Sequence, residues 1–223
     1  MISIKKNVAI LVLTLIVGCS PTNSAQNNVS QKTSSPQSQS EILKDTLIIP
    51  GKRVGRVTGK TTRADLVKMF GESKLTDDII LEDEGTLSVP VTKVNLGTEN
   101  YFTVAWEEDT RQKVLYISNF GSGWKIPEGI GVGTSFEELK QKLGEFKLTG
   151  LGWDYGGFIN LETTKLSKYQ GQISLKLAPD EKAVKKYPQQ YQAVLNDREL
   201  SSSNSNWESL DMKVSQMIVL FDE

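Results

Sequence analysis

The sequence predicts an α+β fold made of two tandem helix-plus-antiparallel-sheet repeats packed side by side. The first observation behind this prediction is an internal repeat, because the segment that begins at Thr61 recurs at Thr134. The second is that runs with the alternation of β-strands follow each copy. The folded part therefore divides into repeat unit one, residues 41–123, and repeat unit two, residues 124–223. The identical pairs in the two copies are Thr61/Thr134, Leu66/Leu139, Gly71/Gly144 and Glu72/Glu145.

Each copy carries the signature of a short capped helix. Thr62 and Ser135 are N-cap candidates, and an acid follows each of them three residues later, as in a capping box. The acids are Asp65 and Glu138, which also favour the positive end of the helix dipole. A glycine then supplies the left-handed residue that ends each helix. Helices this short are not stable alone, so we expect both to pack on a sheet.

The strands of repeat unit one are predicted by alternation. Residues 101–106 and 114–118 are β-rich runs, and the polar segment 107–112 between them indicates a hairpin loop. Residues 87–94 form a weaker strand pattern that is interrupted by Pro90.

Repeat unit two has two strong strand patterns, at residues 172–177 and 212–221. Between them we expect a short helix at 188–195 and a loop at 201–206. One face of the last strand is predicted to carry Met212, Val214, Ile218 and Leu220.

Residues 1–18 have the pattern of a secretory signal peptide. Lys5 and Lys6 give a basic start, and residues 8–17 are apolar apart from Thr14. This apolar run is too short to span a bilayer, which needs about 20 residues.

The end of that segment, Ile-Val-Gly-Cys at residues 16–19, resembles the lipobox of bacterial lipoproteins. The resemblance implies that Cys19 becomes the first residue and is acylated, so that an exported protein is held to its membrane by lipid. Two or more acyl chains give a stable anchor. Ser20 at the next position favours the outer membrane if the cell has one. The alternative is a plain signal peptide with a chance cysteine.

Residues 19–40 are predicted to be a disordered tether that begins at the lipidated Cys19. After the cysteine the segment is dominated by Ser, Thr, Asn, Gln and Pro and has no apolar periodicity. A flexible chain of this length spans on the order of 25 Å. The folded part is therefore expected to stay near its membrane.

Composition argues against several function classes. The chain has 26 basic and 27 acidic residues, so no basic excess is available to neutralise nucleic-acid phosphates. It has no histidine and one cysteine, which removes the histidine-dependent triads and leaves no common zinc-ligand set. We therefore expect no nucleic-acid partner, no metal, no cofactor and no enzymatic activity.

The order of capped short helix, terminal glycine and β-meander, given twice, resembles the fold of β-lactamase-inhibitor proteins. It is also similar to the small outer-membrane assembly lipoproteins, which carry one such unit. The stretch 139–144 and the sequence Gly-Trp-Asp-Tyr-Gly-Gly at 152–157 resemble an uncharacterised family of bacterial lipoproteins. These resemblances imply a protein-binding module of the accessory or inhibitor kind. The inhibitors normally carry disulfides, which a chain with one cysteine cannot form.

The candidate binding face is a set of aromatic residues among glycines. Trp124, Trp153, Asp154 and Tyr155 are its members, because aromatic rings on glycine-rich loops can offer a flat surface to a partner or a sugar. The alternative is that the tryptophans fill the seam between the repeats. Trp207 lies in a polar segment and is either exposed or folded back.

Three functions follow from these observations. The first is a non-catalytic envelope lipoprotein that binds an envelope protein. The second is a lipoprotein that binds cell-wall glycan or another ligand through Trp124, Trp153 and Tyr155. The third is a secreted hydrolase that uses paired carboxylates. The acids clustered in apparent loops are Asp77, Asp78, Glu82, Asp83 and Glu84, and Glu107, Glu108 and Asp109.

Overall fold

The structure is a computed structural model that describes residues 45–153 and 156–222. Short helices and antiparallel sheets alternate along the chain, which confirms the predicted α+β class. The signal peptide at 1–18, Cys19 and the tether at 19–40 lie outside the described residues. In the described part, no helix is long and apolar enough to cross a membrane.

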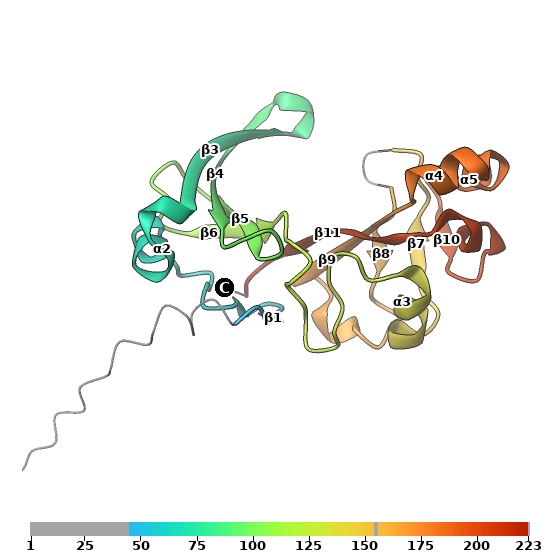
Figure 1. The fold of residues 1–223 in the computed structure, drawn as a ribbon, viewed down its shortest axis with the longest axis horizontal. Coiled ribbons are helices and arrows are strands. Elements are labelled where there is room, and N and C mark those ends of the chain that lie inside the picture. The colour runs from blue at the N-terminus through green and yellow to red at the C-terminus, as the bar shows by residue number, and fades with distance from the viewer. Residues whose placement is uncertain (1–44, 154–155, 223) are drawn as a thin grey trace, which may run out of the picture. The chain divides into compact units, whose positions relative to one another are not determined.

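The main sheet has six antiparallel strands drawn from both repeats (Figure 1). The four strands of repeat unit one are consecutive in it, and the last strand of repeat unit one pairs with the last strand of repeat unit two. From one edge to the other the strands are β3 (Leu75–Glu82), β4 (Leu87–Asn95), β5 (Tyr101–Trp106), β6 (Val114–Ser118), β11 (Lys213–Val219) and β9 (Ile173–Ala178).

A three-stranded sheet continues the second repeat. Its order is β10 (Glu199–Ser201), β7 (Lys147–Thr149) and β8 (Ile159–Asn160). A bridge between Phe158 and Lys176 joins it to β9. Repeat unit one thus contributes β3, β4, β5 and β6, and repeat unit two contributes β7, β8, β9 and β11. In each set of four, the first strand, β3 or β7, lies farthest from the β6–β11 junction. The two repeats therefore run outward from that junction in mirrored order.

The predicted caps explain both repeat helices, α2 (Arg63–Phe70) and α3 (Phe136–Leu143). Thr62 and Asp65 form a complete capping box at α2. At α3 the Ser135 side chain accepts from the Glu138 N–H, while the Glu138 carboxylate lies 3.4 Å from Lys142 Nζ. Gly71 and Gly144 follow the helices with φ of 85° and 81°.

The identical threonines that precede the caps make the same hydrogen bond in both copies. Thr61 Oγ1 accepts a hydrogen bond from the Thr58 N–H, and Thr134 Oγ1 accepts one from the Gly131 N–H, both at 3.0 Å. Both threonines are buried. They close the turn that leads into each helix, which accounts for the repeated threonine.

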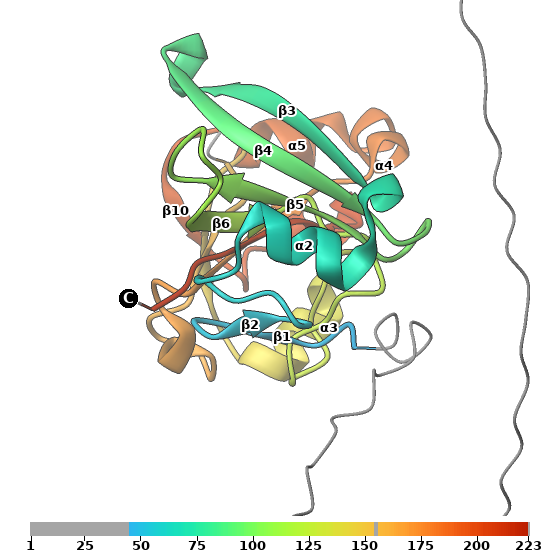
Figure 2. The ribbon, with the colours of Figure 1, turned by 90° about the vertical axis from the view of Figure 1, so that its left-hand side faces the viewer.

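The helices start beside the last strand of their own repeat. The Arg63 N–H donates to the Arg111 carbonyl just before β6, and the Phe136 N–H donates to the Met212 carbonyl just before β11. Figure 2 shows α2 lying across the sheet. The remaining short strands and α-helices are β1 (Ile48–Ile49), β2 (Arg53–Val54), α4 (Glu181–Lys186) and α5 (Pro188–Val194). Short 3₁₀ helices lie at Glu72–Lys74, Asp83–Gly85, Ser167–Tyr169 and Ser205–Leu210.

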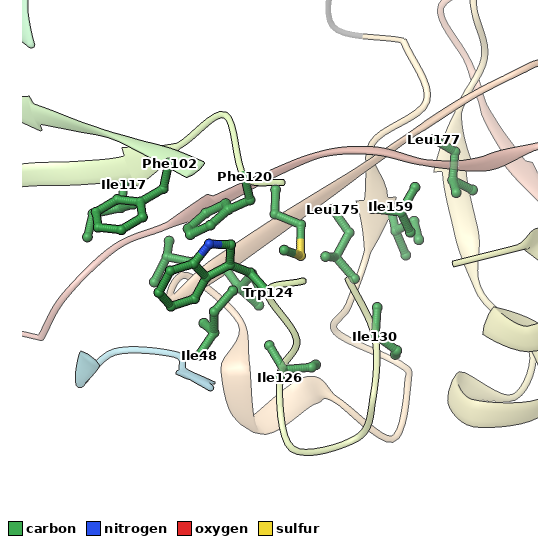
Figure 3. Close-up of a cluster of buried hydrophobic side chains, with 14 of the residues drawn as sticks. Ile48, Phe102, Ile117, Phe120, Trp124, Ile126, Ile130, Ile159, Leu175 and Leu177 are labelled. Atoms are coloured by element: carbon green, nitrogen blue, oxygen red, sulfur yellow. The ribbon is translucent and has the colours of Figure 1, made fainter. Parts of the chain in front are cut away.

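One hydrophobic core serves both repeats. The rings of Phe102 and Trp124 meet edge to face with centroids 5.1 Å apart, and Phe120 lies beside them (Figure 3). Leu66 of α2 and Leu139 of α3 belong to the same buried cluster. The Ile48 N–H of the first hairpin donates to the carbonyl of Lys125, so the repeats are also joined at the backbone.

Several local predictions are confirmed, and others are wrong. Strands occupy 101–106 and 114–118 as expected, and α5 covers most of 188–195. The acids at positions 77–82 lie on β3, not in a loop. The predicted loop at 201–206 contains the end of β10 and the start of the 3₁₀ helix.

The face predicted for the last strand is also wrong in its second half. A register shift separates Val214 from Gln216 where β11 pairs with β9. The extra residue reverses the alternation, so Met217 and Val219 are buried in place of Ile218 and Leu220.

Ile117→Ala tests the shared core. Ile117 of β6 is fully buried at the junction with β11, so we expect a loss of about 2–5 kcal/mol in the free energy of unfolding. Leu115→Ala on the same strand is the control, because Leu115 is 39 % exposed and its loss should cost within about 0.5 kcal/mol. Urea unfolding of the full chain, followed by circular dichroism and tryptophan fluorescence, measures both. Two separate transitions for the two repeats would contradict one shared core.

Candidate functional site

The β3–β4 hairpin extends beyond the rest of the sheet. β3 pairs with β4 from Leu75↔Val94 to Glu82↔Leu87, but β5 pairs with β4 only from Val91 to Asn95. Residues 79–90 therefore form a two-stranded arm with no third strand among the described residues, and Figures 1 and 2 show it reaching out from the sheet. We call these residues the arm.

The arm explains how a strand tolerates Pro90. A proline cannot donate a ladder hydrogen bond, and so it is confined to positions where no partner strand needs one. The pairing of β4 with β5 begins one residue later, at Val91. Pro90 therefore costs no hydrogen bond on that side, and β4 runs through it.

Large apolar side chains are exposed along the arm. Ile79, Leu81 and Leu87 are 57 %, 67 % and 51 % exposed. Ile79 and Leu81 share one face of β3, whereas Leu87 is paired with Glu82 on the other face. An isolated two-stranded ribbon is marginally stable in water, and clustered exposed apolar residues mark interaction sites. These side chains are therefore the best candidate contact residues of the described chain.

A chain of polar contacts holds the base of the arm. Arg63 Nε donates to both oxygens of Asp77, at 2.9 and 3.1 Å, and Thr92 Oγ1 donates to Asp77 Oδ1 at 2.6 Å. The buried Trp106 Nε1 donates to Thr92 at 2.9 Å. Partial burial by itself raises the pKa of Asp77, but the hydrogen bonds from Arg63 and Thr92 bring that pKa below its usual value. The arm thus starts from a fixed point tied to α2, β4 and β5.

No strand of residues 45–153 or 156–222 pairs with the outer edge of β3. β3 is the end strand of its sheet, and the Ile79 N–H donates to the neighbouring Asp78 carboxylate at 2.9 Å. The Asp78 side chain thus accepts the hydrogen bond that a backbone carbonyl of a neighbouring strand would otherwise accept.

The arm is acidic as well as apolar. No Lys or Arg occurs between Leu75 and Thr92. Asp78 pairs with Lys93 at 2.6 Å, and Glu82 accepts a hydrogen bond from the Tyr116 hydroxyl. Burial and this bond raise the pKa of Tyr116, which keeps its hydroxyl protonated as a donor. The carboxylates of the tip are Asp83 and Glu84, both exposed.

The predicted aromatic face is divided by the structure. Trp153 is 73 % exposed, but Trp124 is only 2 % exposed because its ring packs against Phe102. Trp124 therefore belongs to the hydrophobic core and cannot share a surface with Trp153. Asp154 and Tyr155 lie outside the described residues. Trp207 is folded back and fully buried.

The glycines around Trp153 have a packing role. A Cβ on Gly150 would lie 2.4 Å from the Asn196 carbonyl oxygen, and one on Gly152 would lie 2.8 Å from the Asn196 carbonyl carbon. These residues let the loop approach the chain that follows α5. A small hollow of about 210 Å³ remains beside the tryptophan, lined by Thr149, Gly150, Trp153, Gly156 and Asp197.

A larger open cavity, of about 710 Å³, escaped the sequence analysis. It lies between the first turns of α3 and the 3₁₀ helix Ser205–Leu210, and it includes the side chains of Phe136, Trp207 and Met212. Its charged lining residues are Glu137, Lys140, Glu208 and Asp211. No spacing signal could reveal it, because α3 and the 3₁₀ helix are far apart in sequence. Within residues 45–153 and 156–222, no group of acids is placed to hold a metal ion.

Comparisons with known proteins add a single distant likeness. No family model matches the chain, and no curated protein matches it. The crystal structure of the uncharacterized protein yfeY from Escherichia coli is similar at 14 % identity, with a TM-score of 0.46. The match covers 76 % of this chain and 97 % of that one. The resemblances to β-lactamase-inhibitor proteins and to assembly lipoproteins are not confirmed by these comparisons.

Asp77→Asn tests the anchor of the arm. The substitution weakens the charge-assisted bonds from Arg63, so we expect a loss on the order of 1 kcal/mol in the free energy of unfolding at neutral pH. Because the folded-state pKa of Asp77 is lowered, its contribution is present above the unfolded-state pKa and is lost as pH falls through the folded-state pKa. The variant should therefore lose less stability between neutral pH and pH 3.

Urea midpoints across that pH range provide the measurement. Asp109→Asn, at an exposed position of the β5–β6 turn, is the matched control and should leave the profile unchanged. A profile for Asp77→Asn that coincides with the wild-type profile would show that Asp77 does not anchor the arm.

Proposed function

We propose that the chain is a non-catalytic envelope lipoprotein whose folded part binds another protein, with the arm as its docking element. The observation that carries this proposal is the exposure of Ile79, Leu81 and Leu87 along a hairpin whose base is fixed. The lipid on Cys19 and the tether at 19–40 are the part of the proposal that rests on sequence. They would hold the arm within reach of other envelope proteins.

The energetics favour contact with a protein. Full burial of a Leu or Ile side chain is worth about 1.5–3 kcal/mol, so three such residues could anchor a modest interface. The fixed base lowers the ordering cost of binding, since the strand conformation already exists. The carboxylates of the tip would surround the apolar contact and select a partner of opposite charge.

Photo-crosslinking at the arm tests this function. We expect a photoreactive phenylalanine analogue at Leu81 or at Leu87, in the full chain in its own cells, to yield an adduct with the same single envelope protein. The control is Leu195, which is 38 % exposed just after α5, and α5 lies away from the arm in Figure 1. The control position should give no such adduct.

A second substitution makes the result specific. Leu87→Asp, added to the chain that carries the reporter at Leu81, should reduce the adduct at least about tenfold, because a charge replaces an apolar contact. Absence of any protein adduct at both arm positions, or equal adducts at Leu195, would refute a docking role for the arm.

Trp153 supports a second candidate function, the binding of cell-wall glycan. Its exposed ring stands beside a hollow lined by Thr149 and Asp197, a combination of flat apolar surface and polar groups that suits a sugar.

Fluorescence titration of the full chain with soluble peptidoglycan fragments tests it. Glycan binding predicts a shift in tryptophan emission that Trp153→Ala abolishes, with little change in melting temperature because the side chain is exposed. Trp124→Phe, at a buried position, should keep the shift. An emission spectrum that no fragment alters would remove this candidate.

A further inference from the structure

We propose that the outer edge of β3 is a strand-addition site, which accepts an extended segment of alternating apolar and basic residues from a partner protein. The proposal rests on the protein-binding function above and specifies how the arm makes its contact. Three observations carry it: the state of the edge, the internal symmetry of the fold, and the distribution of charge along β3.

The edge of β3 is protected by its acids alone. Exposed edge strands are normally short, bulged, broken by Pro, or guarded by charged side chains, Lys above all. β3 has eight residues, pairs with β4 without a register shift, and contains no Pro or Lys. The Ile79 N–H is satisfied by the side chain of Asp78, which a carbonyl of an added strand could replace.

The second repeat shows what an occupied edge looks like. Its first strand, β7, corresponds to β3, and it already carries an added antiparallel strand, β10, on its far side. The charges of this pair are opposite, with Lys147 Nζ of β7 lying 3.9 Å from the Glu199 carboxylate of β10. β3 therefore corresponds to β7 in the order of the strands, but among the described residues no strand corresponding to β10 pairs with its outer edge.

The charges of β3 define the chemistry of the added strand. One face of β3 presents Ile79 and Leu81, and the other presents Asp78, Ile80 and Glu82. A partner strand beside it places alternate residues next to these two faces. Apolar side chains would therefore match the first face. Lys or Arg would match the second, where Asp78 already pairs with Lys93 and Glu82 carries a charge that its Tyr116 partner does not neutralise.

A second copy of this chain would bring two acidic strands together. Antiparallel pairing of two β3 strands centred on Ile80 sets Asp78 opposite Glu82, and like charges directly opposite each other are destabilising. Pairing centred on Ile79 sets no acids directly opposite each other, but it still places two strands without Lys or Arg side by side. The charge of the edge therefore favours a basic partner over a second copy.

Hydrogen–deuterium exchange of the full chain tests the site. The probe is an acetylated and amidated peptide of four Val-Lys repeats, with four Val-Glu repeats as the charge control. A peptide of the same composition in two blocks, four Val followed by four Lys, is the pattern control. We expect the alternating basic peptide alone to slow exchange in residues 75–82.

Ile79→Pro is the decisive variant. It removes the Ile79 N–H, which bonds to the Asp78 side chain, so the ladder with β4 should survive and circular dichroism should be unchanged. Ile79→Val keeps the donor and is the matched control. The proline should weaken peptide binding at least about tenfold relative to the valine. Leu81→Ala, which leaves the backbone intact, should weaken it as well and covers the case in which the proline variant fails to fold.

The outcomes separate this proposal from the function it rests on. No protection of residues 75–82 in the wild-type chain, or equal binding of the acidic or block peptide, would overturn strand addition. So would dimerisation of the chain alone with β3 protected, because a second copy would then occupy the edge. If the partner crosslinks at Leu81 equally in the wild-type and Ile79→Pro chains, protein binding stands and strand addition fails. Absence of the crosslink in both refutes the proposed function itself.

Discussion

The contact between β6 and β11 is the constraint on which the rest of the structure depends. Ile117 and Val219 are paired there and fully buried, so the last strands of the two repeats become neighbours in one sheet. Each repeat helix is too short to be stable alone. Because both helices pack on the same continuous core, neither repeat has to build a complete core from its own residues. The capped turns at Thr61 and Thr134 then place each helix against the last strand of its repeat.

Joining the repeats at their last strands leaves their first strands on the outside. The two outer ends differ in a way that the symmetry does not require. β10 covers β7, whereas β3 is a free edge that continues into the arm. The arm is fixed at its base through Asp77 and exposes apolar side chains along its length. The proposed docking element thus lies at the end of the fold where the second repeat has a further strand and the first repeat has none among the described residues.

The sequence predicted the features that depend on local chemistry. Thr62 and Ser135 cap the helices, and the strands at 101–106 and 114–118 have the expected bounds. It missed β3 because a run with several acids has the composition of a solvated loop. The partner of Asp77 is Arg63 of α2, and this contact forms only when the chain is folded. It misjudged the inward face of β11 because a bulge adds one residue to the alternation. Trp124 and Trp153 looked alike among their glycines, yet one is buried and the other exposed.

The sequence by itself determined the α+β class, the internal repeat, the helix caps and the absence of histidine chemistry, because each of these is written in residue type and short spacing. Only the tertiary structure decided which tryptophan is core, which strand forms an open edge and where the acids of β3 find partners. Burial and pairing depend on segments far apart in the chain, and a pattern of neighbouring residues carries no information about what lies across a sheet. For that reason the arm, which carries the proposed function, could be recognised only once β3, β4 and β5 were aligned in register.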